Sequence, residues 1–108
     1  MPREPSRYLL LKVLSDDKIV EETFRLSIME SILNLFGEAG LVEAKPRLVN
    51  YDEKAATAIV RCTRGSVEKL RASIALIYRI GETPTATYVT AVSGTTKGLK
   101  PKRASMSN

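Results

Sequence analysis

The residues of this chain most able to do chemistry lie where two strand-like runs end. The first run ends in Arg-Cys-Thr-Arg at 61–64 and leads directly into a helix that opens Ser-Val-Glu at 66–68. The second run ends in Ser-Gly-Thr at 93–95. Both arrangements place cations or backbone N–H donors at the ends of elements, where a phosphate backbone can be held. Neither is an enzyme motif, so the pattern favours binding of a polyanion over catalysis.

Side chains suited to catalysis are scarce. The 108 residues include no histidine, which removes the commonest general base and metal ligand. Cys62 is the only cysteine, so we expect neither an internal disulfide nor a structural zinc site. A cysteine inside an apolar run is typically a small core residue. The paired acids, Asp16-Asp17 and Asp52-Glu53, stand at helix-cap or turn positions. The sequence therefore predicts no catalytic residue, no metal ligand and no bound cofactor.

The charge balance is basic, with 17 lysines and arginines against 12 acids, a net charge of +5 and a pI near 9.6. Such a balance favours a polyanionic partner. We expect Lys12 to lie beside Arg61 on one face, and the cations after 95 to add nonspecific phosphate affinity. Two alternatives stay open: Lys69 and Arg71 as ordinary solvent-facing helix charges, and the basic end as a solubilising tail. The predicted RNA-binding residues are Lys12, Arg61, Arg64, Gly65, Ser66, Lys69, Arg71, Lys97, Lys100, Lys102 and Arg103.

Apolar periodicity predicts six elements in the order strand, helix, strand, strand, helix, strand. Pro46 favours an edge or irregular position for the second strand. Gly37 and Gly40 are expected to end the first helix, and Gly81 the second. The expected elements span 8–14, 19–36, 41–51, 55–62, 66–78 and 85–92. The expected division is a flexible N-terminal arm (1–6), one domain (7–94) and a basic, disordered tail (95–108).

This order is that of the ferredoxin-like, RRM-like βαββαβ sandwich, an α+β fold whose antiparallel sheet carries its helices on one face. Strand alternation assigns six side chains to the helix-covered face: Leu9, Leu11, Val13, Ala58, Val60 and Cys62. The open face would carry Tyr8, Leu10, Lys12, Ile59 and Arg61. Because the third strand offers no aromatic there, we do not expect standard base stacking. An apolar open face with two cations suits a protein contact at least as well.

The first helix carries two apolar stripes, which is more than a one-sided surface helix needs. One stripe is Phe24, Ile28, Ser31 and Leu35, and the other is Leu26, Met29, Leu33 and Phe36. Either the helix covers much of a small sheet, or one stripe meets a partner protein. The predicted partner-interface residues are Leu10, Met29, Leu33 and Ile59.

Several segments, taken in order, resemble a known family. These segments are 7–9, 36–40, 60–62, 70–77 and 93–95, which read Arg-Tyr-Leu, Phe-Gly-Glu-Ala-Gly, Val-Arg-Cys, Leu-Arg-Ala-Ser-Ile-Ala-Leu-Ile and Ser-Gly-Thr. They resemble ribonuclease P protein component 2, the small protein subunit of the archaeal and eukaryotic enzymes. The chain lacks large insertions, and in this respect it is more similar to an archaeal member.

The resemblance implies a noncatalytic subunit that assists an RNA catalyst in maturing the 5′ end of precursor tRNA. It implies two partners, the ribonuclease P RNA and a barrel-type protein subunit, commonly in a two-plus-two assembly, with precursor tRNA met only indirectly. Magnesium is expected in the RNA and not in this chain. We expect a cytoplasmic location, nuclear in a eukaryote, and no membrane contact, because no apolar run approaches about 18 residues. From the residues alone, a ferredoxin-like ligand-binding or regulatory module without RNA remains the alternative.

Overall fold

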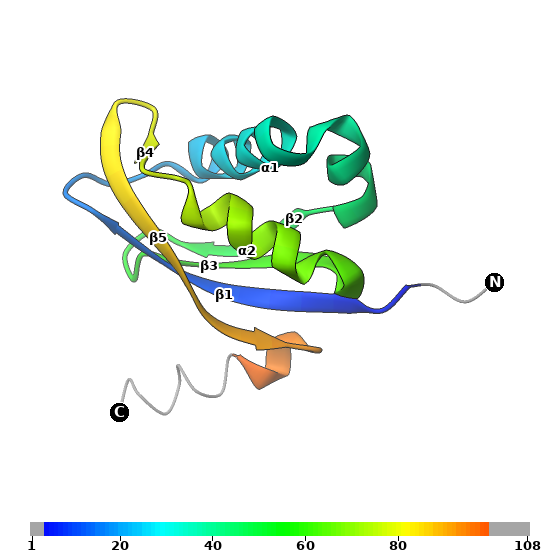
Figure 1. Ribbon diagram of the computed structural model, residues 1–108. Coiled ribbons are helices and arrows are strands. Elements are labelled where there is room, and N and C mark those ends of the chain that lie inside the picture. Colours follow the sequence, from blue (N-terminus) through cyan, green and yellow to red (C-terminus); the bar gives the residue numbers. More distant parts are fainter. Residues whose placement is uncertain (1–3, 100–108) are drawn as a thin grey trace.

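The computed structural model describes residues 4–99, which form an antiparallel sheet with helices packed on one face (Figure 1). The strand order across the sheet is β2-β3-β1-β5-β4. This is the predicted α+β, ferredoxin-like arrangement, with one short additional strand. The elements are β1 (Ser6–Ser15), α1 (Glu21–Ala44), β2 (Arg47–Asp52), β3 (Thr57–Thr63), η1 (Arg64–Ser66), α2 (Val67–Ala75), β4 (Arg79–Ile80), β5 (Thr83–Ser93) and η2 (Thr96–Gly98).

The core lies between the sheet and the two α-helices, and the predicted alternation of the central strands is confirmed. All six side chains assigned to the helix-covered face are buried: Leu9, Leu11, Val13, Ala58, Val60 and Cys62. From α2, Leu70 and Ile74 pack into the same cluster. Pro46 immediately precedes β2, which is an edge strand as predicted.

The buried stripe of α1 differs from the predicted one. Phe24 and Ile28 are buried as expected, but Ile32 completes the stripe and Leu35 is exposed. The observed spacing is therefore i, i+4, i+8, which keeps three apolar side chains on one side of the helix. Ser31 lies at the boundary, where its hydroxyl donates a hydrogen bond to the Ser73 carbonyl of α2 at 2.6 Å.

The expectation that Gly37 and Gly40 end the first helix is confirmed in part: the first helical segment stops at Gly37, but Gly40 lies inside a second segment. Gly37 kinks the helix, with φ of 71° and ψ of −174°, and the second helical segment continues to Ala44. Gly40 is needed for a different reason, since a Cβ there would lie 2.3 Å from the Cβ of Phe36. The helix ends at Lys45, whose left-handed backbone lets its N–H donate to the Leu41 carbonyl.

The second helix is shorter than predicted, and a strand follows it. α2 ends at Ala75, and the chain then enters β4, which pairs with the start of β5. Gly81 therefore does not stop a helix. It stands in the two-residue connection of this hairpin with φ of 61°, a conformation that glycine adopts without steric cost.

Ordered structure extends beyond the predicted domain limits of 7 and 94 at both ends. Ser6 opens β1, and the Pro5 carbonyl accepts a hydrogen bond from the Arg64 N–H at 2.8 Å. At the other end, η2 lies on the side of the sheet away from α1 and α2 (Figure 1), and Leu99 is buried. Residues 1–3 of the predicted arm and residues 100–108 of the predicted tail lie outside the described residues.

Within residues 4–99, no helix is long and apolar enough to cross a membrane. No group of three or more cysteine and acidic side chains in that part of the chain could hold a metal ion.

Candidate nucleic-acid interface

Strand pairing brings two arginines into one line across the open face of the sheet. Arg47 of β2 stands opposite Arg61 of β3, and Arg61 stands opposite Tyr8 of β1. Residues opposite one another in antiparallel strands point to the same face, with Cα atoms about 5 Å apart. We call Arg47, Arg61 and Tyr8 the arginine row. The row thus combines two cations with an aromatic residue, and the Tyr8 hydroxyl has no hydrogen-bond partner within the described residues.

The arginine row is an electropositive line without internal neutralisation. Within the described residues, neither Arg47 nor Arg61 forms an ion pair or a side-chain hydrogen bond. Like charges directly opposite on neighbouring strands are destabilising. A bound phosphate would remove that repulsion and accept charge-assisted hydrogen bonds from both side chains. The row is therefore suited to a polyanion.

Arg64 extends this surface beyond the end of β3, in the exposed turn η1. One of the backbone donors predicted beside it is already engaged. The Gly65 N–H donates to the Glu4 carboxylate at 3.1 Å, so a phosphate would have to displace that side chain. Ser66 is buried, and its hydroxyl lies 2.9 Å from that of Thr63. Its side chain therefore faces inward, and the predicted contribution of its backbone N–H stays a prediction.

Lys12 was predicted to lie beside Arg61 on the open face. It shares that face, but it does not lie beside Arg61. Its partner across the strands is Thr57, four residues before Arg61, which corresponds to about 13 Å along β3. Its ammonium donates to the Ala55 carbonyl at 2.7 Å, in the turn between β2 and β3. Lys12 therefore fastens a turn and does not extend the arginine row.

The helix cations form local pairs. Lys69 pairs with Glu43 of α1 and lies 5.8 Å from the centre of the Phe36 ring. Arg71 places Nε 3.7 Å from a carboxylate oxygen of Glu68, one turn earlier on α2. These contacts favour the open alternative, in which both are ordinary helix-surface charges. Of the tail, Lys97 lies exposed in η2, while Lys100, Lys102 and Arg103 lie outside the described residues.

The predicted partner-interface residues divide into exposed and buried ones. Met29 and Leu33 line a shallow hollow of about 460 Å³ on α1, together with the exposed Leu26. We call Leu26, Met29 and Leu33 the outer α1 stripe. Leu10 is half-buried on the open face.

Ile59 is the correction among these interface residues. It was expected to be exposed on the open face, yet it is only 1% exposed. Neither Ile59 nor Leu99 belongs to the main core, and η2 lies on the open-face side of the sheet (Figure 1). Ile59 is therefore not available as an exposed contact for a partner protein.

Cys62 is a core residue, as its sequence position indicated. Burial raises the pKa of its thiol to about 11, and the negative charge of Glu4 adds to the effect. At neutral pH the sulfur is therefore a protonated thiol packed under the helices, and it is not a nucleophile.

Sequence reasoning missed Arg47 and undervalued Tyr8. Arg47 follows Pro46 on an edge strand, and nothing in its own neighbourhood distinguishes it from other cations. Only the register between β2 and β3 places it opposite Arg61. Tyr8 was placed on the open face but given no binding role; β1 begins at Ser6 and is central, so this residue is within the sheet.

Comparison with known proteins gives consistent results over nearly the whole chain. A sequence model of the Rpp14/Pop5 family matches residues 7–103. The chain is 37% identical over 100 residues to ribonuclease P protein component 2 of Pyrococcus abyssi, covering 93% of this chain and 85% of that protein. The protein of the same name from Methanocaldococcus jannaschii is 35% identical over 100 residues, covering 93% and 73%. A chain in the cryo-EM structure of yeast ribonuclease MRP shares the fold, with a TM-score of 0.70 and 14% identity over 99% of this chain and 98% of that one.

Proposed function

Because this chain belongs to the Rpp14/Pop5 family, we propose that it is a noncatalytic protein subunit of ribonuclease P. In this role it assists an RNA catalyst in maturing the 5′ end of precursor tRNA. The observation that carries the proposal is the family match over residues 7–103, supported by identities of 30–37% to proteins named ribonuclease P protein component 2. The chemistry is assigned to magnesium ions on the RNA, with this chain contributing cations. We place the complex in the cytoplasm.

The arginine row is the surface we assign to the ribonuclease P RNA. Arg47 and Arg61 offset phosphate repulsion where RNA strands pack together, and Arg64 adds a third cation at the end of β3. Phosphate contacts release counterions, so each contact adds roughly 1 to the slope of log affinity against log salt. Precursor tRNA would be affected indirectly, through the RNA that this surface stabilises.

The test is RNA affinity measured across a salt series for Arg47→Ala, Arg61→Ala and the double variant. We expect each single change to lower the slope by roughly 1. Arg71→Ala is the matched control, because its guanidinium is exposed but paired with Glu68. Lower affinity at an unchanged slope would assign Arg47 and Arg61 to folding or to a protein contact instead.

The outer α1 stripe is the surface we assign to a partner protein, a barrel-type ribonuclease P subunit in a two-plus-two assembly. The apolar side chains of the stripe are exposed to water, because neither the sheet nor α2 covers them. Protein interfaces bury such groups at their centres. Leu33 and Leu35 are both 41% exposed, but only Leu33 lines the hollow. Leu33→Asp should abolish copurification of the partner, whereas Leu35→Asp should preserve it. Equal behaviour of the two variants would exclude the stripe as the interface.

A further inference from the structure

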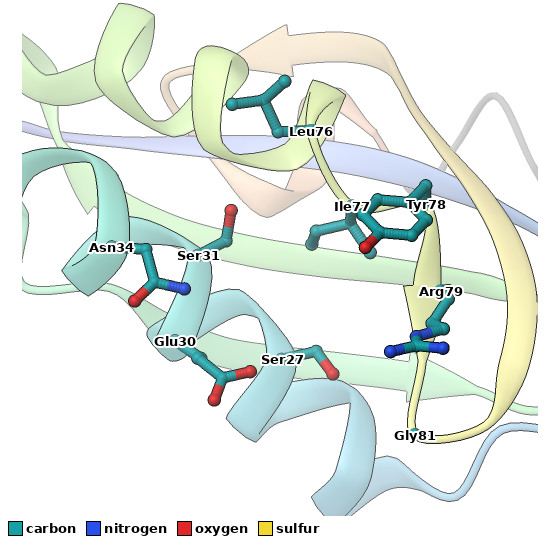
Figure 2. A pocket seen from close by; sticks show the side chains of 9 residues that line it. All are labelled: Ser27, Glu30, Ser31, Asn34, Leu76, Ile77, Tyr78, Arg79 and Gly81. Carbon is teal, nitrogen blue, oxygen red and sulfur yellow. The ribbon is translucent and has the colours of Figure 1, made fainter.

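A second polar site lies on the helix side of the sheet, away from the arginine row. It is a pocket of about 350 Å³ between α1 and the segment that links α2 to β5 (Figure 2). Glu30 and Asn34 of α1 form one wall, and Tyr78 and Arg79 form the other. Its volume is in the lower part of the range for small-ligand pockets, about 300–1,000 Å³. No residue of the arginine row or of the predicted sites lines it.

Three polar side chains of this pocket have no hydrogen-bond or ion-pair partner within the described residues, whereas a fourth, Ser31, donates to the Ser73 carbonyl. Within the described residues, the Glu30 carboxylate and the Arg79 guanidinium form no ion pair and no hydrogen bond. Asn34 likewise has no side-chain partner there. In Figure 2 the guanidinium of Arg79 extends towards α1, opposite the wall that carries Glu30. The pocket thus presents a charged acceptor on one side and a charged donor on the other.

An aromatic ring stands at the edge of the same pocket. Tyr78 is 75% exposed, more than any other large hydrophobic residue among those the structure describes. Within the described residues, its only ring contact is with Arg79, whose guanidinium carbon lies 5.9 Å from the ring centre. An exposed ring of this kind is a stacking platform for a nucleobase.

We propose that this pocket binds one unpaired guanine nucleotide of an RNA strand, an inference that rests on the proposed RNA-binding function. Guanine has adjacent N1–H and N2–H donors on one edge, which a carboxylate accepts together, and O6 and N7 acceptors on another edge, which arginine reads bidentately. Glu30 and Arg79 supply this pair from opposite walls. Tyr78 stacks on the base face, as aromatic side chains do in single-stranded RNA recognition.

The other bases would form fewer hydrogen bonds with the side chains of this pocket. Adenine and cytosine each present a single exocyclic amino group, and uracil presents one ring N–H, so none offers two adjacent donors to Glu30. An acidic peptide could pair with Arg79 but would be repelled by Glu30. A carboxylate and a guanidinium on opposite walls beside an aromatic ring therefore select a base that has two adjacent donors on one edge and two acceptors on another.

The experiment measures binding of the full chain to short uridine-rich RNA oligonucleotides that carry one central guanosine, inosine or adenosine. We expect the guanosine oligonucleotide to bind about 5- to 100-fold more tightly than the adenosine one. Inosine, which lacks the N2 amino group, should fall between them. Glu30→Gln should reduce the guanosine preference several-fold, and Tyr78→Leu should weaken binding of all three oligonucleotides. Glu38→Gln is the matched control, an exposed acid on α1 outside the pocket.

The outcomes separate this inference from the proposed function. A guanosine preference that disappears in Glu30→Gln and persists in Glu38→Gln supports the pocket. RNA binding that depends on Arg47 and Arg61 but shows no guanosine preference overturns the pocket and leaves the proposed function standing. Loss of partner-protein binding in Arg79→Ala, without change in base preference, would assign the pocket to a protein and also overturn it, because Arg79 does not line the hollow of the outer α1 stripe. Absence of binding to every oligonucleotide would overturn the pocket and count against the proposed function.

Discussion

At the scale of single residues, the chain separates cations that hold the fold together from cations that have no partner. Lys12 and Lys69 each reach an oxygen of the same chain, the Ala55 carbonyl and the Glu43 carboxylate. Arg47 and Arg61 face one another without an acid in the described structure. An unpaired like-charge pair costs stability in the free protein. Its presence is therefore what we expect of a surface that binds a polyanion, which is the role we propose for the arginine row.

Cys62 gives the residue-scale prediction. Its pKa is raised from 9.0 to about 11 because burial disfavours the thiolate. The stabilising effect of the neutral thiol is fully present below pH 9 and is lost as the pH rises towards 11. At about 1.4 kcal/mol per pKa unit, the loss should approach about 2–3 kcal/mol. We expect urea unfolding to show a steeper decline between pH 9 and 11 for the wild type than for Cys62→Ala. Parallel declines would show that the thiol titrates normally.

At the scale of elements, sequence reasoning succeeded where the signal is local. The two-residue period of β1 and β3 assigned six core side chains correctly, because alternation within a strand needs no knowledge of its neighbours. It failed where partners matter. The position of Arg47 opposite Arg61 depends on strand register, and the burial of Ile59 coincides with the placement of η2 on the open-face side. The pocket beside Tyr78 was missed because its walls come from elements about 45 residues apart.

The first helix shows how one local signal can have two outcomes. Glycine was expected to end the helix, and Gly37 does leave helical geometry, but helical structure resumes and continues to Ala44. A glycine signal marks a backbone conformation and does not specify what the chain does afterwards. The second segment is held by tertiary contacts, since Gly40 and Ala44 are buried and Leu41 packs on the core.

The element-scale prediction concerns this kink. Gly37 has φ of 71° and ψ of −174°, a region open essentially only to glycine, so Gly37→Ala should destabilise the protein by about 1–3 kcal/mol. The cause would be backbone strain alone, because nothing lies within 4 Å of a Cβ at that position. Gly94→Ala is the control: its φ is not positive, and the nearest atom, in Arg7, is 3.7 Å away. Denaturant midpoints should fall for Gly37→Ala only. Equal midpoints for the two variants would contradict the strain.

At the scale of the whole molecule, the surfaces are divided among different faces. The arginine row lies on the open face, whereas the outer α1 stripe and the pocket beside Tyr78 lie on the helix side. A net charge of +5 spread over 108 residues attracts RNA without specifying where it binds. If the proposed assignments hold, separation of the faces would let the chain contact RNA and a protein partner simultaneously. No catalytic group is needed for that role.

The whole-molecule prediction follows from this division of labour between protein charge and magnesium. In the reconstituted enzyme, the double variant Arg47→Ala/Arg61→Ala should need a higher magnesium concentration for half-maximal cleavage of precursor tRNA. High magnesium should restore its rate, because both cations offset the same phosphate repulsion. Arg71→Ala should match the wild type. Asp52→Asn should also retain cleavage, since the Asp52 carboxylate accepts a hydrogen bond from the Ala55 N–H in a turn. A defect in the double variant that persists at every magnesium concentration would show that the arginine row acts by shape or assembly, and not by charge.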